Sequence, residues 1–174
     1  MKTTSRVLVA LAVCLAMVAC TKKVKTEDTG NSNNNAGTDN GAQTNPMTGD
    51  GMYGPEDLDT DSCLRQRVVY FDFDQDNLKP EFQAAIACHA KYLRDRPSAR
   101  MTLEGHADER GTREYNLGLG ERRGNAVSAA VQGSGGSGSQ ITVTSLGEER
   151  PTCLDSTDDC WSKNRRVEIS YSSK

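Results

Sequence analysis

The sequence lacks the motifs that mark common enzyme classes. It contains no G-x-S-x-G, no H-E-x-x-H and no glycine-rich phosphate loop. Histidine is scarce, and only His106, near Glu104 and Asp108, suggests a metal site or acid–base chemistry. Because no second histidine joins that cluster in the sequence, we expect a protein that is not an enzyme and that needs no cofactor and no metal.

A surplus of positive charge is also absent. The chain has 21 basic and 24 acidic residues, a formal net charge of -3, and from Cys63 onward the two signs are equal in number. Proteins that bind nucleic acid usually carry a basic patch or stripe, and this sequence has none large enough. We therefore expect no nucleic-acid partner.

No apolar run is long enough to span a bilayer comfortably. The longest, Val7–Ala19, is shorter than the roughly 20 residues of a membrane-spanning helix, and it follows Lys2 and Arg6 as in an export signal. The run ends in Met-Val-Ala before Cys20, which resembles a bacterial lipobox, where the cysteine is lipidated and the chain is cut before it. We expect a signal peptide over residues 1–19 and a lipid anchor on Cys20. An ordinary secretory signal is the alternative.

Large apolar residues are almost missing from the next stretch, Thr21–Asp61. It is rich in Asn, Gly, Thr, Asp and Pro, and a segment of this composition cannot bury enough surface to fold alone. We therefore expect a disordered linker over residues 20–62, carrying the lipid at one end, and a folded domain over residues 63–174.

Four cysteines remain for the folded domain: Cys63, Cys88, Cys153 and Cys160. An even number of cysteines in an exported protein indicates disulfides, and four cysteines allow three pairings. We favour Cys63 with Cys88, which would join the start of the domain to its first helix, and Cys153 with Cys160, which would close a short loop. A zinc site is the alternative, although no pair has the close spacing of zinc ligands.

Apolar periodicity divides the domain into six elements. Four segments read as strands and two as helices, and the second helix is buried through Leu119, Ala126, Val127 and Ala130. The strands are Val68–Phe73, Arg100–His106, Ile141–Leu146 and Arg165–Tyr171; the helices run from Pro80 to before Pro97 and from Arg113 to Gln132; and a loop spans Gly147–Asp159. This β-α-β-α-β-β order predicts an α+β two-layer sandwich, with both helices on one face of a four-stranded mixed sheet.

One stretch carries the most chemistry. Asp108 follows the second strand, and Arg123 lies two to three turns into the next helix. If that helix folds back beside the strand, a carboxylate and a guanidinium face one pocket, a pair that suits a zwitterionic ligand. The alternative is a purely structural salt bridge between the two residues. We expect Gly105 and Gly111 to serve turn geometry, and Glu109, Arg110 and Arg113 to form a solvated rim.

Several separated motifs resemble the OmpA-like peptidoglycan-binding domain family, and within it the peptidoglycan-associated lipoproteins. They are Gly105–Gly111, Glu114–Leu117, Leu119–Arg123, Val69–Asp74 and Lys163–Val167. The resemblance runs from about Val68 to Tyr171. It implies the same two-layer fold.

The resemblance also assigns site residues. It implies that Asp108 holds the ammonium group and Arg123 the carboxylate of meso-diaminopimelate in the peptidoglycan stem peptide. Phe73, Asp74, Leu119, Asn164 and Arg165 complete the peptidoglycan-binding set, and Tyr115 and Asn116 position the turn.

By the same resemblance, the protein tethers the outer membrane to the cell wall without a covalent bond to the wall. Thr21 after the lipidated cysteine favours the outer membrane, with the domain in the periplasm. A TolB-like periplasmic protein is the expected partner, as in the Tol–Pal system of envelope integrity and cell division. The alternative is a lipoprotein that acts mainly as a periplasmic protein-interaction module.

Overall fold

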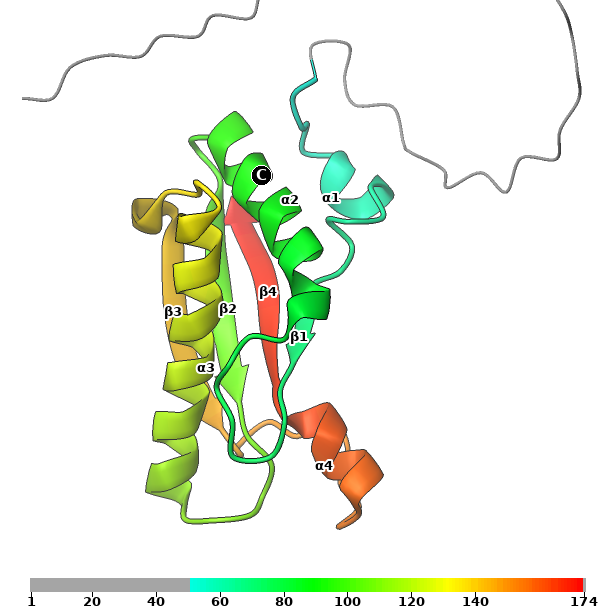
Figure 1. The fold of residues 1–174 in the computed structure, drawn as a ribbon, viewed down its shortest axis with the longest axis vertical. Helices are drawn as coiled ribbons and strands as arrows, with labels where there is room; N and C mark the ends of the chain where they lie inside the picture. The colour runs from blue at the N-terminus through cyan, green and yellow to red at the C-terminus, as the bar shows by residue number, and fades with distance from the viewer. Residues whose placement is uncertain (1–50, 174) are drawn as a thin grey trace, which may run out of the picture. The chain divides into compact units, whose positions relative to one another are not determined.

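The computed structural model describes residues 51–173, and its centre is a four-stranded sheet (Figure 1). The strand order is β1-β4-β2-β3; β2 and β3 are parallel, and β4 is antiparallel to β1 and β2. The strands are β1 (Val68–Tyr70), β2 (Arg100–His106), β3 (Ile141–Gly147) and β4 (Arg166–Ser173). The sheet is therefore mixed, as predicted.

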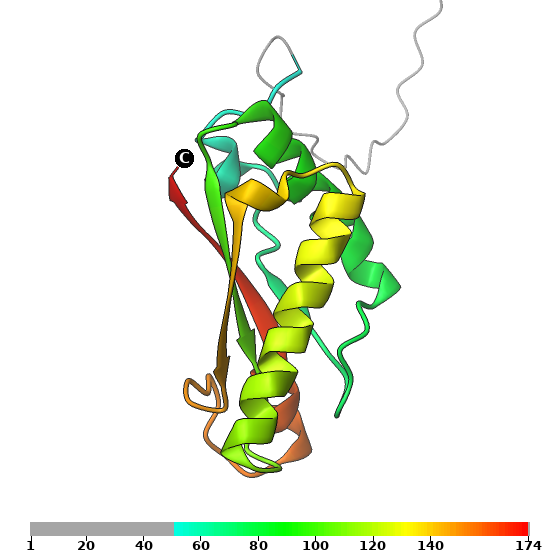
Figure 2. The ribbon, with the colours of Figure 1, turned by 90° about the vertical axis from the view of Figure 1, so that its left-hand side faces the viewer.

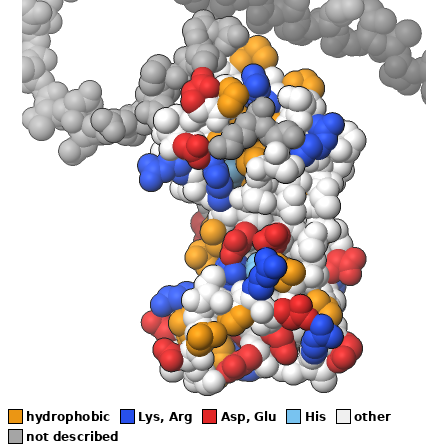
Figure 3. Space-filling view, turned by 180° about the vertical axis from the view of Figure 1, so that it is seen from behind, with side chains coloured by type: hydrophobic (Ala, Val, Ile, Leu, Met, Phe, Trp, Pro, Cys, Tyr) orange, Lys and Arg blue, Asp and Glu red, His pale blue; other side chains and the backbone are white. Residues whose placement is uncertain are grey.

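Two long helices cover one face of this sheet. They are α2 (Gln83–Asp95), which follows a 3₁₀ turn at Pro80–Phe82, and α3 (Arg113–Gly133). Figure 2 shows both helices on the same side of the strands, and Figure 3 looks at the opposite face, which they leave open. The predicted two-layer α+β sandwich is confirmed. No helix within residues 51–173 has the length and apolar character needed to cross a membrane.

The core lies between the sheet and these helices. Met101 and Leu103 of β2 and Val167 and Ile169 of β4 point toward the helices, because side chains alternate along a strand. They pack with a second set of buried residues that comes mostly from the helices: Phe71, Ile86, Leu93, Val127 and Val131. Burying each such side chain contributes about 1.5–3 kcal/mol. Of the predicted stripe on α3, Leu119 and Val127 are buried, whereas Ala126 and Ala130 are only partly so.

The folded part begins earlier than predicted. Tyr53 is 6% exposed and Leu58, in the short helix α1 (Asp57–Thr60), is fully buried in the core. The backbone N–H of Tyr53 also donates to Asp95 of α2 at 2.8 Å. The predicted boundary at Cys63 is therefore wrong, because two apolar residues of this polar stretch join the core and a hydrogen bond to α2 also holds it. The predicted signal, Cys20 and the linker up to residue 50 lie outside the described residues.

Both favoured disulfides are present in the structure. Cys63 pairs with Cys88, joining the segment before β1 to α2, and Cys153 pairs with Cys160. The second disulfide lies in a region that was predicted to be a loop as far as Asp159 but contains helix α4 (Asp158–Asn164). Thr157 caps this helix by accepting from the backbone N–H of Cys160 at 3.3 Å.

A close approach of α3 to β2 sets the geometry at one end of the sheet. A Cβ atom on Gly105 of β2 would lie 1.9 Å from the carbonyl oxygen of Gly120 in α3. Only a pair of glycines permits this contact. The prediction that Gly105 serves turn geometry is therefore wrong, because it lies within the strand. Gly111, with φ +112°, does occupy a turn that favours glycine.

Candidate functional site

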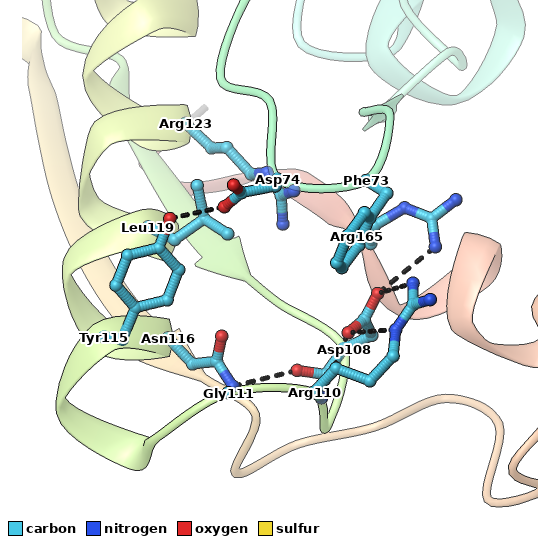
Figure 4. Close-up of a pocket in the computed structure, with 10 residues that line it drawn as sticks. All are labelled: Phe73, Asp74, Asp108, Arg110, Gly111, Tyr115, Asn116, Leu119, Arg123 and Arg165. Carbon is cyan, nitrogen blue, oxygen red and sulfur yellow. Dashed lines mark hydrogen bonds and ion pairs between the residues drawn. The ribbon is translucent and has the colours of Figure 1, made fainter.

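A hollow of about 200 Å³ lies at the end of the sheet where α3 begins (Figure 4). Four segments meet there: the loop after β1, the turn after β2, the first turns of α3 and the residue before β4. The lining residues are Phe73, Asp74, Asp108, Arg110, Gly111, Tyr115, Asn116, Leu119, Arg123 and Arg165.

Local hydrogen bonds fix the turn that carries Asp108. Thr112 caps α3 by accepting from the backbone N–H of Tyr115 at 3.2 Å. The side-chain amide of Asn116 donates to the carbonyl oxygen of Asp108 at 3.1 Å. Asn116 therefore joins the helix start to the strand end, which is the positioning role predicted for it, although it also lines the hollow.

Asp108 is buried and surrounded by arginine donors. The Oδ1 atom of Asp108 accepts from the backbone N–H and from Nε of Arg110, both at 3.1 Å. The Oδ2 atom of Asp108 accepts from Nη2 of Arg110 at 2.7 Å and from Nη1 of Arg165 at 3.2 Å. Burial acts to raise the pKa of Asp108, but the hydrogen bonds from Arg110 and Arg165 outweigh it and lower that pKa. Asp108 is thus an ionised carboxylate whose four acceptor positions are all occupied.

Arg110 is held by two aromatic rings as well as by Asp108. The central carbon of its guanidinium lies 4.0 Å from the ring centre of Phe73 and 4.1 Å from that of Trp161. A guanidinium over a ring face is attracted by the ring's negative centre. Arg110 was predicted to belong to a solvated rim. That prediction is wrong, because Arg110 packs against the rings of Phe73 and Trp161 and pairs with Asp108. The sequence could not show these ring contacts, because Phe73 and Trp161 come from segments far away in the sequence.

Arg123 is fully buried and holds three backbone carbonyl groups. Its Nε donates to the carbonyl oxygen of Gln75 at 2.8 Å, its Nη1 to that of His106 at 2.8 Å, and its Nη2 to that of Asp72 at 3.1 Å. Burial, followed by repulsion from Arg165, lowers the pKa of Arg123 to about 10, so it stays protonated at neutral pH. Arg123 forms no ion pair with Asp108 in the described part of the chain, so the two do not make the structural salt bridge considered above.

The rim of the hollow is partly aromatic. Tyr115 is 44% and Phe73 55% exposed, and the Tyr115 hydroxyl donates to the carboxylate of Asp74. Asp74 has φ 57°, a left-handed conformation that is uncommon outside glycine and that occurs more often at functional sites. Leu119 forms the apolar wall that the resemblance implied.

Six of the seven predicted residues line this hollow, and Asn164 does not. The Asn164 Oδ1 accepts from the backbone N–H groups of Thr152 at 2.9 Å and Cys153 at 3.1 Å, and its amide donates to the carbonyl of Cys153. Asn164 therefore fixes the loop before α4. Arg110, Gly111, Tyr115 and Asn116 were not in the predicted set; an aromatic residue in the first turn of α3 was the available signal for Tyr115.

The same segments are the ones that match a known protein family. The family model described as the OmpA family matches residues 70–165, which span all of these site segments. The chain belongs to the OmpA family. Among the relatives in this family, the peptidoglycan-associated lipoprotein of Pseudomonas putida is 41% identical over 168 residues, 92% of this chain and 93% of the relative. That of Haemophilus influenzae is 39% identical and covers 80% of this chain and 86% of the relative.

Two solved structures agree with this fold. The crystal structure of the peptidoglycan-associated lipoprotein from Burkholderia pseudomallei is 40% identical and has a TM-score of 0.64, covering 66% of this chain and 98% of that one. The C-terminal domain of Helicobacter pylori MotB, at 20% identity and a TM-score of 0.56, shares the fold. The family predicted from the sequence motifs is confirmed.

Proposed function

We propose that this chain is a lipoprotein that binds peptidoglycan noncovalently through the hollow around Asp108, and that it is not an enzyme. One observation carries the proposal: the ionised carboxylate of Asp108 and the guanidinium of Arg123 line a single small hollow with an apolar wall. The names of the Pseudomonas and Haemophilus relatives support the same ligand. The ligand group is meso-diaminopimelate, which carries both amines and carboxylates.

The hydrogen bonds suggest how each ligand group enters. Arg123 uses three of its five N–H groups on carbonyls, so one N–H on each terminal nitrogen remains for a ligand carboxylate. The ligand ammonium goes to Asp108, where every acceptor position is filled, so it must replace a donor. Arg110 is the replaceable one, because its side chain is 31% exposed, against 13% for Arg165.

Tethering then follows from the rest of the chain. A lipid on Cys20 would hold the outer membrane, the linker would span the gap, and the domain would grip the wall from the periplasm. A single pocket need not bind tightly, since many tethered copies facing a polymer gain avidity. A TolB-like protein of the Tol–Pal system is the proposed protein partner, and the exposed rings of Phe73 and Tyr115 beside the hollow offer it a contact surface.

Co-sedimentation of the full chain with purified diaminopimelate-type sacculi tests the proposal. Asp108→Asn removes the charge while keeping the shape, and we expect at least roughly tenfold weaker binding, since hydrogen bonds to charged groups contribute about 1.5–3 kcal/mol. Arg94→Gln is the matched control, because Arg94 is an exposed arginine of α2 that donates to the carbonyl of Ser134 and is not part of the hollow.

Arg123 itself needs a conservative variant. Its contacts to three carbonyls mean that Arg123→Ala would disturb the loop after β1, so Arg123→Lys, checked by circular dichroism, separates lost binding from lost folding. Unchanged binding in Asp108→Asn and Arg123→Lys would overturn the proposal. Release of soluble fragments from the sacculi would contradict the part that excludes catalysis.

A further inference from the structure

A second cluster of polar side chains lies on the sheet face that the long helices leave open. Leu103 and Gly105 of β2 face α3, so Glu104 and His106, which alternate with them, point to the opposite side. Glu168 of β4 stands directly opposite Glu104 in the antiparallel ladder. Figure 3 looks at this face, where acidic and basic side chains gather around a patch of histidine.

Two carboxylates placed opposite each other repel unless a cation lies between them. Glu104 makes no hydrogen bond or ion pair within residues 51–173. Glu168 uses one oxygen, Oε1, to accept from Nε of Arg166 at 2.6 Å, and its other oxygen has no partner in the described part of the chain. The pair therefore offers two carboxylate oxygens on one side of the sheet.

His106 is the unusual member of the cluster. The residue is 1% exposed, yet neither of its ring nitrogens has a hydrogen-bond partner among residues 51–173. A buried polar group without a partner costs about 1–3 kcal/mol, and such groups are rare in native proteins. One ligand atom from each of Glu104, His106 and Glu168 lies within 4.8 Å of the others.

We propose that Glu104, His106 and Glu168 together bind a divalent transition metal, with Zn²⁺ as the best fit. Zinc takes imidazole nitrogen and carboxylate oxygen at about 2.0–2.2 Å, which places neighbouring ligand atoms roughly 3.4 Å apart in a tetrahedron. Rotation of the two glutamate side chains closes the remaining gap, and water completes the coordination. Calcium and magnesium fit less well, because they prefer oxygen ligands alone. The sequence led us to expect no metal, since it did not show that β4 brings a second carboxylate to His106.

A metal at this site would link two strands close to the ligand hollow. His106 lies two residues before Asp108, and Glu168 lies three residues after Arg165. A metal bound there would join the ends of β2 and β4 that carry two residues of the ligand hollow. Nε of Arg166 donates to Oε1 of Glu168, and Nη2 of Arg166 donates to the carbonyl oxygen of Arg150 at 3.2 Å. Because Oε1 is occupied in this way, the metal binds the other carboxylate oxygen of Glu168.

Calorimetric titration of the EDTA-stripped full chain with ZnCl₂, with MgCl₂ as a second arm, tests the proposal. We expect saturable binding of one Zn²⁺ per chain, no comparable response to Mg²⁺, and a melting temperature about 5–10 °C higher at a hundredfold excess over the dissociation constant. Glu104→Gln and Glu168→Gln, both at partly exposed positions, should each weaken Zn²⁺ binding at least tenfold. Glu121→Gln, on the exposed side of α3, is the matched control and should bind as the parent does.

Cobalt supplies a second readout that does not depend on stability. Co²⁺ in place of zinc should give visible absorption bands that disappear in His106→Gln, if that variant folds, and that weaken in Glu168→Gln. Failure of the parent chain to bind Zn²⁺ saturably would overturn the proposal. So would equal binding by Glu168→Gln and Glu121→Gln, because the metal would then occupy carboxylates elsewhere in the chain.

Discussion

Alanine at two glycines near the site should have opposite effects on stability. At Gly105, a Cβ would lie 1.9 Å from the carbonyl oxygen of Gly120 and 2.6 Å from its carbon, so two backbone segments must separate. Overpacking by side chains that can shift costs about 1–3 kcal/mol, and backbone adjusts less readily. We therefore expect Gly105→Ala to lower the free energy of unfolding by about 3 kcal/mol or more.

Gly118, in the same helix as Gly120, provides the matched comparison. A Cβ there meets only Nη1 of Arg122, at an ordinary 3.5 Å. Alanine is favoured over glycine inside a helix, so Gly118→Ala should raise the free energy of unfolding by about 0.5–1 kcal/mol.

Urea unfolding of the parent and both variants, followed by circular dichroism, measures the two changes. Gly105→Ala should also weaken ligand binding in its folded fraction, because moving α3 away from β2 draws Arg123 from the carbonyl of His106. A Gly105→Ala variant within 1 kcal/mol of the parent protein, or a shift of the urea midpoint in the same direction for both variants, would contradict this prediction.

Three further predictions concern the Cys63–Cys88 disulfide, the buried side chain of His89 in α2, and the ion pair between Arg110 and Asp108. Replacing Cys63 and Cys88 by serine should cost about 3.5 kcal/mol of unfolding free energy in urea, since the disulfide closes a 25-residue separation, and a loss below 1 kcal/mol would contradict this. Burial lowers the pKa of His89, so unfolding takes up a proton below about pH 6.5 and stability falls as the pH drops. His89→Gln should reduce that slope between pH 7 and 5 by up to about 1.4 kcal/mol per pH unit in urea titrations, and an unchanged slope would refute it. Arg110→Gln should raise the affinity for a diaminopimelate peptide about fivefold, measured by calorimetry, because it frees Asp108 from a partly exposed ion pair. Weaker binding would instead mean that Arg110 contacts the ligand.

The sequence predicted the elements whose signal is local. Alternation in Arg100–His106 and the helical repeat after Thr112 each lie within one segment, and the structure has β2 and α3 at those positions. Helix α4 was missed because seven residues carry little periodicity. Its cap at Thr157, followed by two aspartates, was a readable start signal.

Part of the site could be predicted for the same reason. Asp108 and Arg123 sit at fixed distances from a strand end and a helix start, so their meeting at one hollow followed from the fold class. Two of the three carbonyl partners of Arg123, those of Asp72 and Gln75, could not be predicted, because the loop that carries them has no regular structure. The stacking of Arg110 between Phe73 and Trp161 depends on three segments that only the tertiary fold brings together.

Calorimetric binding of two soluble stem peptides tests the central claim most directly. The peptides should be identical except that one carries meso-diaminopimelate and the other lysine, which lacks the side-chain carboxylate. If the hollow recognises both the ammonium and the carboxylate, the full chain should bind the diaminopimelate peptide at least roughly tenfold more tightly, a difference of about 1.4 kcal/mol. Asp108→Asn and Arg123→Lys should weaken that binding. Equal affinity for the two peptides would contradict the assignment of this hollow as the peptidoglycan site.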